Sequence, residues 1–187
     1  MREAGAESGI RWIDDSGNSP VIARLSRSIG LPGFLPDILG LAIRTTEHGT
    51  PSDILLASTG PTGLGRFMLY PHRNAAKAVF SSMMPYKTTS GPVLLAARTI
   101  GGPEMLPATP EAFPASLQDG TWVLEMHYAT PLGPWNRFGT LTLTVDGQPH
   151  DTGLRFDPLL NPLPGAGTYG WTRRLREPSY TAARRPK

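Results

Sequence analysis

Short blocks of apolar and β-branched residues recur along this chain, and glycines or prolines separate them from one another. The chain has 21 glycines and 20 prolines among its 187 residues, so it is rich in turns. Short apolar blocks bounded by turn residues are typical of strands. The predicted strands are Val21–Ser26, Ile38–Thr45, Asp53–Ser58, Val93–Arg98, Trp122–Ala129 and Gly139–Val145. Many short strands with few helices predict a mainly β (α+β) fold, a barrel or a sandwich.

The clearest of these strands is Gly139–Val145, in which leucine or valine alternates with threonine. A period of two predicts one buried face and one face in water. Asp146 and Gly147 follow directly, and this pair is a strong hairpin signal. We therefore expect His150–Phe156 to be the second strand of a hairpin.

Other segments depart from the strand pattern. Asn74–Met84 is rich in alanine, starts with a good capping residue and is followed by a proline, which predicts a short helix. Four prolines in Gly101–Gly120 predict a surface loop or insert, and three in Asp157–Thr168 predict an extended crossing. Trp171–Arg185 is expected to form a short C-terminal helix.

The length suits one domain, which we expect to span residues 1–187. We expect residues 1–19 to be an N-terminal extension and residues 171–187 a basic helix or tail. The absence of cysteine excludes disulfides, a thiolate nucleophile and iron–sulfur clusters. No apolar run approaches ~18 residues, and no secretory signal begins the chain, so we expect a cytoplasmic protein without a membrane span.

Positive charge gathers at the C-terminal end of the chain. Against the single acid Glu177, this end carries Arg173, Arg174, Arg176, Arg184, Arg185 and Lys187. Such a cluster can meet nucleic acid, a membrane surface, or the carboxylates or phosphates of a ligand. We do not expect a nucleic-acid binder, because that needs aromatic side chains interleaved with the basic ones. Homo-oligomerisation remains open.

Hydrolase sites find little support in the sequence. His48, His72, His127 and His150 do not pair at metal-ligand spacing, and we expect ordinary surface or satisfied core histidines. The chain has neither a Gly-Lys-Ser/Thr phosphate loop nor a Gly-x-Ser-x-Gly elbow.

Several segments, taken in order from Pro20 to Lys187, resemble the haem catalase superfamily. They are Val21–Ser26 (family Val-Arg-Phe-Ser), Asp37–Arg44 (Arg-Gly-Phe-Ala), Asp53–Leu56 (Asp-Leu), Phe138–Leu143 (Val-Gly-Lys-Leu-Val-Leu), Phe156–Pro158 (Phe-Asp-Pro) and Arg176–Tyr180 (Arg-x-x-x-Tyr). The resemblance implies an antiparallel β-barrel of catalase-like type that binds haem b. Short relatives of this kind are also labelled phosphodiesterases, but no metal or phosphate site in this sequence supports that label.

By the same resemblance, Tyr180 is the iron ligand and Arg176 its partner. Arg24 would meet a haem propionate, Ser26 would lie on the distal side, and Arg184 would meet a propionate as well. A phenol with a pKa near ~10 needs a cation to stabilise its anion. On a helix, the i, i+4 spacing puts Arg176 and Tyr180 on one face, and arginine keeps its charge at any working pH.

The chain departs from the family on the distal side. Family catalases carry a histidine about 35 residues before the Val-Arg-Phe-Ser strand, whereas the 23 residues before Arg24 include none. Ala57 and Ser58 stand where the family has an asparagine. Because peroxide cleavage needs a base over the iron, we expect a weak peroxidase or a converter of small organic or lipid hydroperoxides.

Two alternatives stay open. In the first, the barrel has lost its chemistry and keeps a pocket for haem or another apolar ligand. In the second, the true start lies upstream of Met1 and carries the distal histidine.

Overall fold

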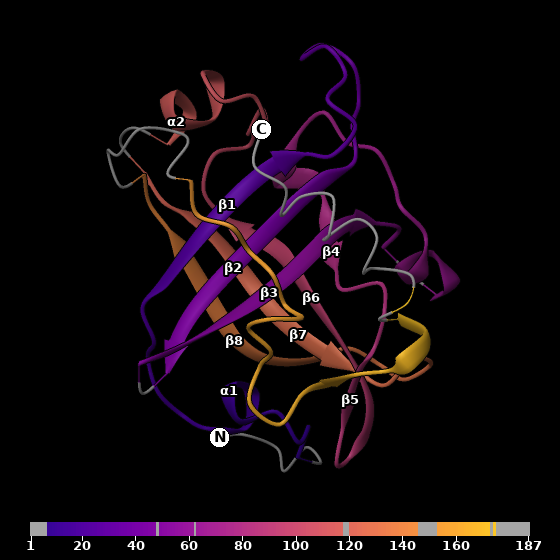
Figure 1. Cartoon of the computed structure of the whole chain (residues 1–187). Coiled ribbons are helices and arrows are strands. Elements are labelled where there is room, and N and C mark those ends of the chain that lie inside the picture. The colour runs from indigo at the N-terminus through magenta and orange to yellow at the C-terminus, as the bar shows by residue number, and fades with distance from the viewer. Residues whose placement is uncertain are drawn as a thin grey trace.

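The computed structural model describes residues 7–47, 49–61, 63–117, 120–145, 153–172 and 174. In these residues nine antiparallel strands form one sheet that curls into a half-barrel (Figure 1). The strands are β1 (Val21–Arg27), β2 (Leu39–Glu47), β3 (Thr50–Thr59), β4 (Val79–Ser81), β5 (Tyr86–Thr88), β6 (Gly91–Gly101), β7 (Trp122–Ala129), β8 (Asn136–Leu143) and β9 (Gly167–Thr168). The helical elements are α1 (Arg11–Asp14), α2 (Ala112–Ser116), and the 3₁₀ turns η1 (Gly63–Phe67) and η2 (Ala75–Lys77).

The main path through the sheet is β1-β2-β3-β4-β6-β7-β8, and β5 and β9 form a small branch beside β6. Among the described strands, β1 pairs only with β2 and β8 only with β7. The sheet therefore curls but leaves a seam between β1 and β8. The expected mainly β, antiparallel, barrel-like fold is confirmed, and each of the six predicted strands overlaps an observed one.

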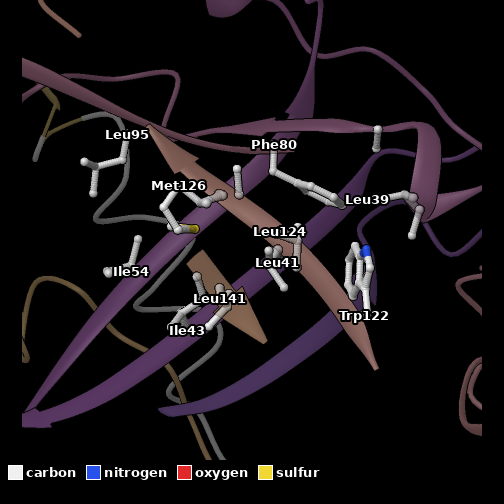
Figure 2. Close-up of a cluster of buried hydrophobic side chains, with 14 of the residues drawn as sticks. Leu39, Leu41, Ile43, Ile54, Phe80, Leu95, Trp122, Leu124, Met126 and Leu141 are labelled. Atoms are coloured by element: carbon white, nitrogen blue, oxygen red, sulfur yellow. The ribbon is translucent and has the colours of Figure 1, made fainter. Parts of the chain in front are cut away.

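The concave side of the sheet holds the core (Figure 2). Alternate residues of neighbouring strands point into it, as a period of two requires. Its largest fully buried side chains include Leu39, Leu41, Ile43, Ile54, Phe80, Leu95, Trp122, Leu124 and Met126. Trp122 sits edge-on to both Phe80 and Phe113, with ring centroids 6.0 Å apart in each pair. Full burial of one such side chain stabilises the fold by about 1.5–3 kcal/mol.

The predicted helix Asn74–Met84 is wrong beyond its first turn. The Asn74 side chain does cap a turn by accepting a hydrogen bond from the Ala76 amide, but this 3₁₀ turn ends at Lys77. The next residues form β4, which pairs with β3 on one side and β6 on the other. Phe80 of β4 is fully buried in the core. Val79 and Phe80 have a high strand propensity, and pairing with β3 and β6 adds to it, so the helical preference of the preceding alanines does not extend into β4.

The predicted hairpin after β8 is also wrong where it can be checked. Residues 146–152, which include the Asp-Gly turn, lie outside the described residues, and residues 153–156 are not a strand. These residues instead begin a crossing over the outer face of β1, β2 and β3 (Figure 1). The crossing lacks regular structure as the prolines predict, apart from the two residues of β9, but it is not extended throughout, because the amides of Leu160 and Asn161 donate to the Asp157 carbonyl in a turn.

Two other expectations are settled only in part. The proline-rich segment Gly101–Gly120 is largely irregular as predicted but also contains the short helix α2. The predicted C-terminal helix lies mostly outside the described residues. No helix in the described ranges has the length and apolar character that a membrane crossing requires.

Candidate functional site on the outer face of β1, β2 and β3

The outer face of the first three strands carries several small side chains, with Leu55 of β3 opposite Ala42 as the large apolar side chain among them. Ser26 of β1 lies opposite Gly40 of β2, which lies opposite Ala57 of β3. Ala42 faces the same way, because residues two apart on a strand share a face. We call Ser26, Gly40, Ala42 and Ala57 the small-residue shelf. Arg24 borders the shelf, since it lies opposite Ala42.

Gly40 allows close packing at one point of this shelf. A Cβ atom on Gly40 would come within 2.7 Å of the Ser26 Oγ atom, which is closer than real side chains approach. The Ser26 hydroxyl lies across Gly40 and donates a 3.4 Å hydrogen bond to its carbonyl oxygen. The shelf is therefore flat and closely packed at its centre.

Two arginines hold the C-terminal crossing against this face. The guanidinium carbons of Arg24 and Arg44 lie 5.0 Å and 5.3 Å from the ring centroid of Phe156. Arg24 also donates a 3.1 Å hydrogen bond to the carbonyl of Leu154, and Arg44 donates one of 2.7 Å to the carbonyl of Arg155. The Phe-Asp-Pro segment is thus attached to β1 and β2 by cation–π and hydrogen-bond contacts.

Asp53 on β3 is the centre of these contacts. The Nε and Nη2 atoms of Arg44 each donate to a different carboxylate oxygen of Asp53 at 2.6 Å. The backbone amide of Asp157 and the side-chain amide of Asn161 also donate to Asp53, at 2.7 Å and 2.8 Å. Asp53 is fully buried, and its carboxylate accepts hydrogen bonds both from β2 and from the crossing.

The charge state of Asp53 follows from this environment. Burial by itself raises the pKa of this carboxyl, but hydrogen bonds from Arg44, Asn161 and the Asp157 amide outweigh burial and lower the pKa below its usual value. Asp53 is therefore ionised and fully engaged at neutral pH. It serves to hold the crossing rather than to move protons.

A second charged cluster lies on the outer side of β6, β7 and β8. Glu125 accepts hydrogen bonds from the Nε and Nη2 atoms of Arg98 at 3.0 Å and 2.7 Å. The Nε atom of Arg137 lies 3.2 Å from Glu125, and Nε2 of His127 lies 3.1 Å away. The hydrogen bond from Arg98 lowers the pKa of Glu125; burial opposes this, and the charges of His127, Arg98 and Arg137 add to it.

The two described histidines both have a pKa below the usual value. Burial lowers the pKa of His127 more than Glu125 raises it, and burial also lowers that of His72. The imidazole of His127 contacts the Glu125 carboxylate, and the backbone of His72 forms a β-bridge with Asp37. Within the described ranges no group of three or more His, Cys, Asp or Glu residues is arranged to hold a metal ion. His48 and His150 lie outside these ranges.

A cleft of about 990 Å³ opens at the seam between β1 and β8. Its apolar lining comes from Trp12, Val21, Met126, Phe138 and Leu141, and polar groups of residues 15–19 and of β8 surround them. Trp12 of α1 packs edge-on against Phe138 of β8, with the ring centroids 5.4 Å apart. The cleft therefore joins solvent to the edge of the hydrophobic core.

The structure brings two of the predicted site residues together. Arg24 and Ser26 lie on the same outward face of β1, beside the shelf. Arg176, Tyr180 and Arg184 lie outside the described residues, so their predicted roles stay predictions.

The contacts of Arg44 with Asp53 are a feature that sequence reasoning missed. Both residues occur in segments that carry the resemblance, but only the strand register reveals that they face each other.

A comparison of the sequence with models of protein families gives no match, and a comparison with curated proteins gives none either. The function is therefore inferred from the residues of this chain and their arrangement.

Proposed function

We propose that this protein binds haem b against the outer face of β1, β2 and β3, with Tyr180 as the iron ligand. One observation carries the proposal. Four of the six segments that resemble haem catalases, far apart in sequence, meet where Arg24 and Arg44 stack on Phe156 and Asp157 donates to Asp53. In such a centre Arg176 would stabilise the phenolate form of Tyr180.

The described residues fit such a group. A planar macrocycle stacks on a flat surface, and Ser26, Gly40 and Ala57 offer one, with Leu55 of β3 at its side. A haem propionate needs a cation beside that surface. Arg24 is exposed and uses Nη1 for the Leu154 carbonyl, which leaves other guanidinium donors for a carboxylate.

Bound haem would supply the redox chemistry with peroxides, while the protein residues decide how protons move. The outward-facing residues of β1, β2 and β3 beside the shelf include no histidine, and Asp53 is ionised and held by Arg44. Without a base to transfer a proton between the peroxide oxygens, disproportionation of hydrogen peroxide is slow. We propose a weak peroxidase or a converter of organic hydroperoxides, including lipid hydroperoxides.

The test is the absorbance spectrum of the full chain titrated with haem. We expect a spectrum distinct from that of free haem for the wild-type protein and for Tyr169→Phe, a matched control. Tyr180→Phe should remove the difference, because the anionic oxygen ligand is lost. Identical spectra for wild-type protein and Tyr180→Phe would contradict the proposal.

Arg176→Leu tests the partner of the ligand. We expect the wild-type spectrum to appear only at higher pH in this variant, because the phenolate then lacks its nearby cation. An unchanged pH dependence would contradict the role of Arg176. It would not bear on Tyr180, which the Tyr180→Phe spectrum tests.

A second candidate function is non-catalytic binding of an apolar ligand, and the cleft between β1 and β8 favours it. Gly139 lines this cleft, and a Cβ atom there would meet nothing within 4 Å. Gly139→Trp should therefore occupy the cleft and abolish binding of an apolar fluorescent dye. Gly120→Leu, which also adds its side chain into open space but does not line the cleft, is the control. Peroxide turnover above that of free haem would rule out a purely binding role.

A further inference from the structure

Arg66 on η1 is a buried cation without an acid partner. Three described arginines are mostly buried: Arg27 and Arg44, with side chains 9% and 15% exposed, and Arg66, 8% exposed as a residue. Arg27 lies 3.5 Å from Asp37, and Arg44 lies 2.6 Å from Asp53. In the part of the chain that the structure describes, no carboxylate forms an ion pair with Arg66.

Among the described residues, the contacts of Arg66 leave its Nε atom without an acceptor. Its Nη1 atom donates to the carbonyl of Gly133 at 2.9 Å, and its guanidinium carbon lies 4.6 Å from the ring centroid of Trp135. Its Nε atom is buried and has no hydrogen-bond partner. The Nε and Nη2 edge is the edge with which Arg44 holds both oxygens of Asp53. The acceptor that fits this edge is a planar carboxylate.

The backbone around Arg66 is held firmly. Ser81 donates a 2.9 Å hydrogen bond from its Oγ atom to the carbonyl of Arg66 and accepts one of 3.0 Å from the Met83 amide. Met83 has a φ of +55°, which is costly for a residue with a side chain. Arg66 is thus held at its backbone by Ser81 and at its guanidinium by Gly133. A fixed donor edge loses little freedom when it binds an anion.

Exposed apolar residues lie close to Arg66 along the chain. Leu64 of η1 precedes Arg66 by two residues, Met68 directly follows η1, and they are 73% and 66% exposed. Leu132, which directly precedes the Gly133 contact, is 87% exposed. Exposed apolar side chains gathered beside a polar anchor are typical of a binding site for an amphiphile.

We propose that Arg66, Trp135 and the apolar side chains beside them form a binding site for an amphiphilic carboxylate. The carboxylate would accept hydrogen bonds from the Nε and Nη2 edge of Arg66, and its hydrocarbon would lie over Leu64, Met68 and Leu132. This site is distinct from the shelf on β1, β2 and β3 and does not depend on haem.

The experiment is calorimetric titration of the full chain with dodecanoate below its micelle concentration. We expect dodecanoate to bind, dodecanol and acetate to bind much more weakly, and Arg66→Met to weaken dodecanoate binding about tenfold or more. Arg11→Met is the control, since Arg11 is an exposed arginine with an acid partner, and it should bind dodecanoate like wild type. Equal affinity of Arg66→Met and wild type would overturn the proposal. Tighter binding of inorganic phosphate than of dodecanoate would overturn the choice of a carboxylate.

A second measurement covers the case in which Arg66→Met does not fold. In the wild-type protein, dodecanoate should shift the arginine Nε–H resonance that Arg66→Lys lacks in heteronuclear NMR spectra. Arg66→Lys keeps the positive charge but loses the planar edge, so it should bind dodecanoate more weakly than wild type. A resonance unmoved at saturating dodecanoate would exclude contact with this edge.

Discussion

Two outward faces of the same sheet carry the same cross-strand pair, an arginine opposite an acid. Arg44 lies opposite Asp53 on β2 and β3, and Arg98 lies opposite Glu125 on β6 and β7. The first pair is 15% and 0% exposed in its side chains, whereas in the second Arg98 remains 60% exposed and Glu125 is 12% exposed.

The difference comes from what packs over each pair. The crossing adds donors from Asp157 and Asn161 to Asp53 and places Phe156 beside Arg44. Around Glu125 the added partners are His127 and the exposed Arg137. The same kind of pair on the sheet therefore becomes a buried anchor in one place and a more exposed pair in the other, where water screens the attraction.

The largest effect is expected from breaking the buried pair. Asp53→Asn should lower the free energy of unfolding by about 3–5 kcal/mol, because it leaves the charge of Arg44 buried without its partner. Urea unfolding followed by circular dichroism measures this loss. The double variant Asp53→Leu with Arg44→Met removes both charges and should recover part of it. A loss below about 1 kcal/mol for Asp53→Asn would mean that the crossing does not depend on this anchor.

The buried carboxylates should also make the stability of the fold depend on pH. Burial alone would raise the pKa of Asp37 and Asp53, but hydrogen bonds lower both: from the amides of Ile29, Leu31 and Gly30 in Asp37, and chiefly from Arg44 in Asp53. A lowered folded-state pKa stabilises the fold above the unfolded value near ~3.9, and this stability is lost as the pH falls through the folded pKa. Wild-type stability should thus decline below about pH 4, and Asp53→Asn should show a shallower decline. Parallel slopes in acid for the two proteins would contradict the assignment.

A smaller effect is expected from Phe156→Leu, which keeps an apolar side chain but removes the ring under Arg24 and Arg44. The free energy of unfolding should fall by about 1–2 kcal/mol, from lost cation–π contacts and imperfect packing. In an Arg24→Met background, Phe156→Leu should lower the free energy of unfolding by less. Equal losses in both backgrounds would argue against stacking of Arg24 on Phe156.

The smallest effect is expected on the exposed side. Glu125→Gln should change the free energy of unfolding by about 1 kcal/mol or less, and added salt should reduce the difference further. Thermal unfolding of wild type and variant at low and high salt measures the effect of the substitution and its dependence on salt. A loss as large as that of Asp53→Asn would show that exposure does not distinguish the two pairs.

Much of the local structure could be predicted because it depends on neighbouring residues. The six predicted strands follow from apolar runs of the right length between turn residues, and the capped turn at Asn74 follows from its side chain. The absence of cysteine is a matter of composition alone, and it excludes thiolate chemistry whatever fold the chain adopts.

Only the tertiary structure decided which strands pair and what covers them. β4 became a strand because β3 and β6 offered partners to its valine and phenylalanine, although the alanines just before it predict a helix. Asp53 and Asp157 are 104 positions apart, yet the hydrogen bond between them makes Asp53 a buried anchor. Local patterns fix backbone preference within a few residues, whereas burial and charge partners depend on contacts between distant segments that form together when the sheet curls.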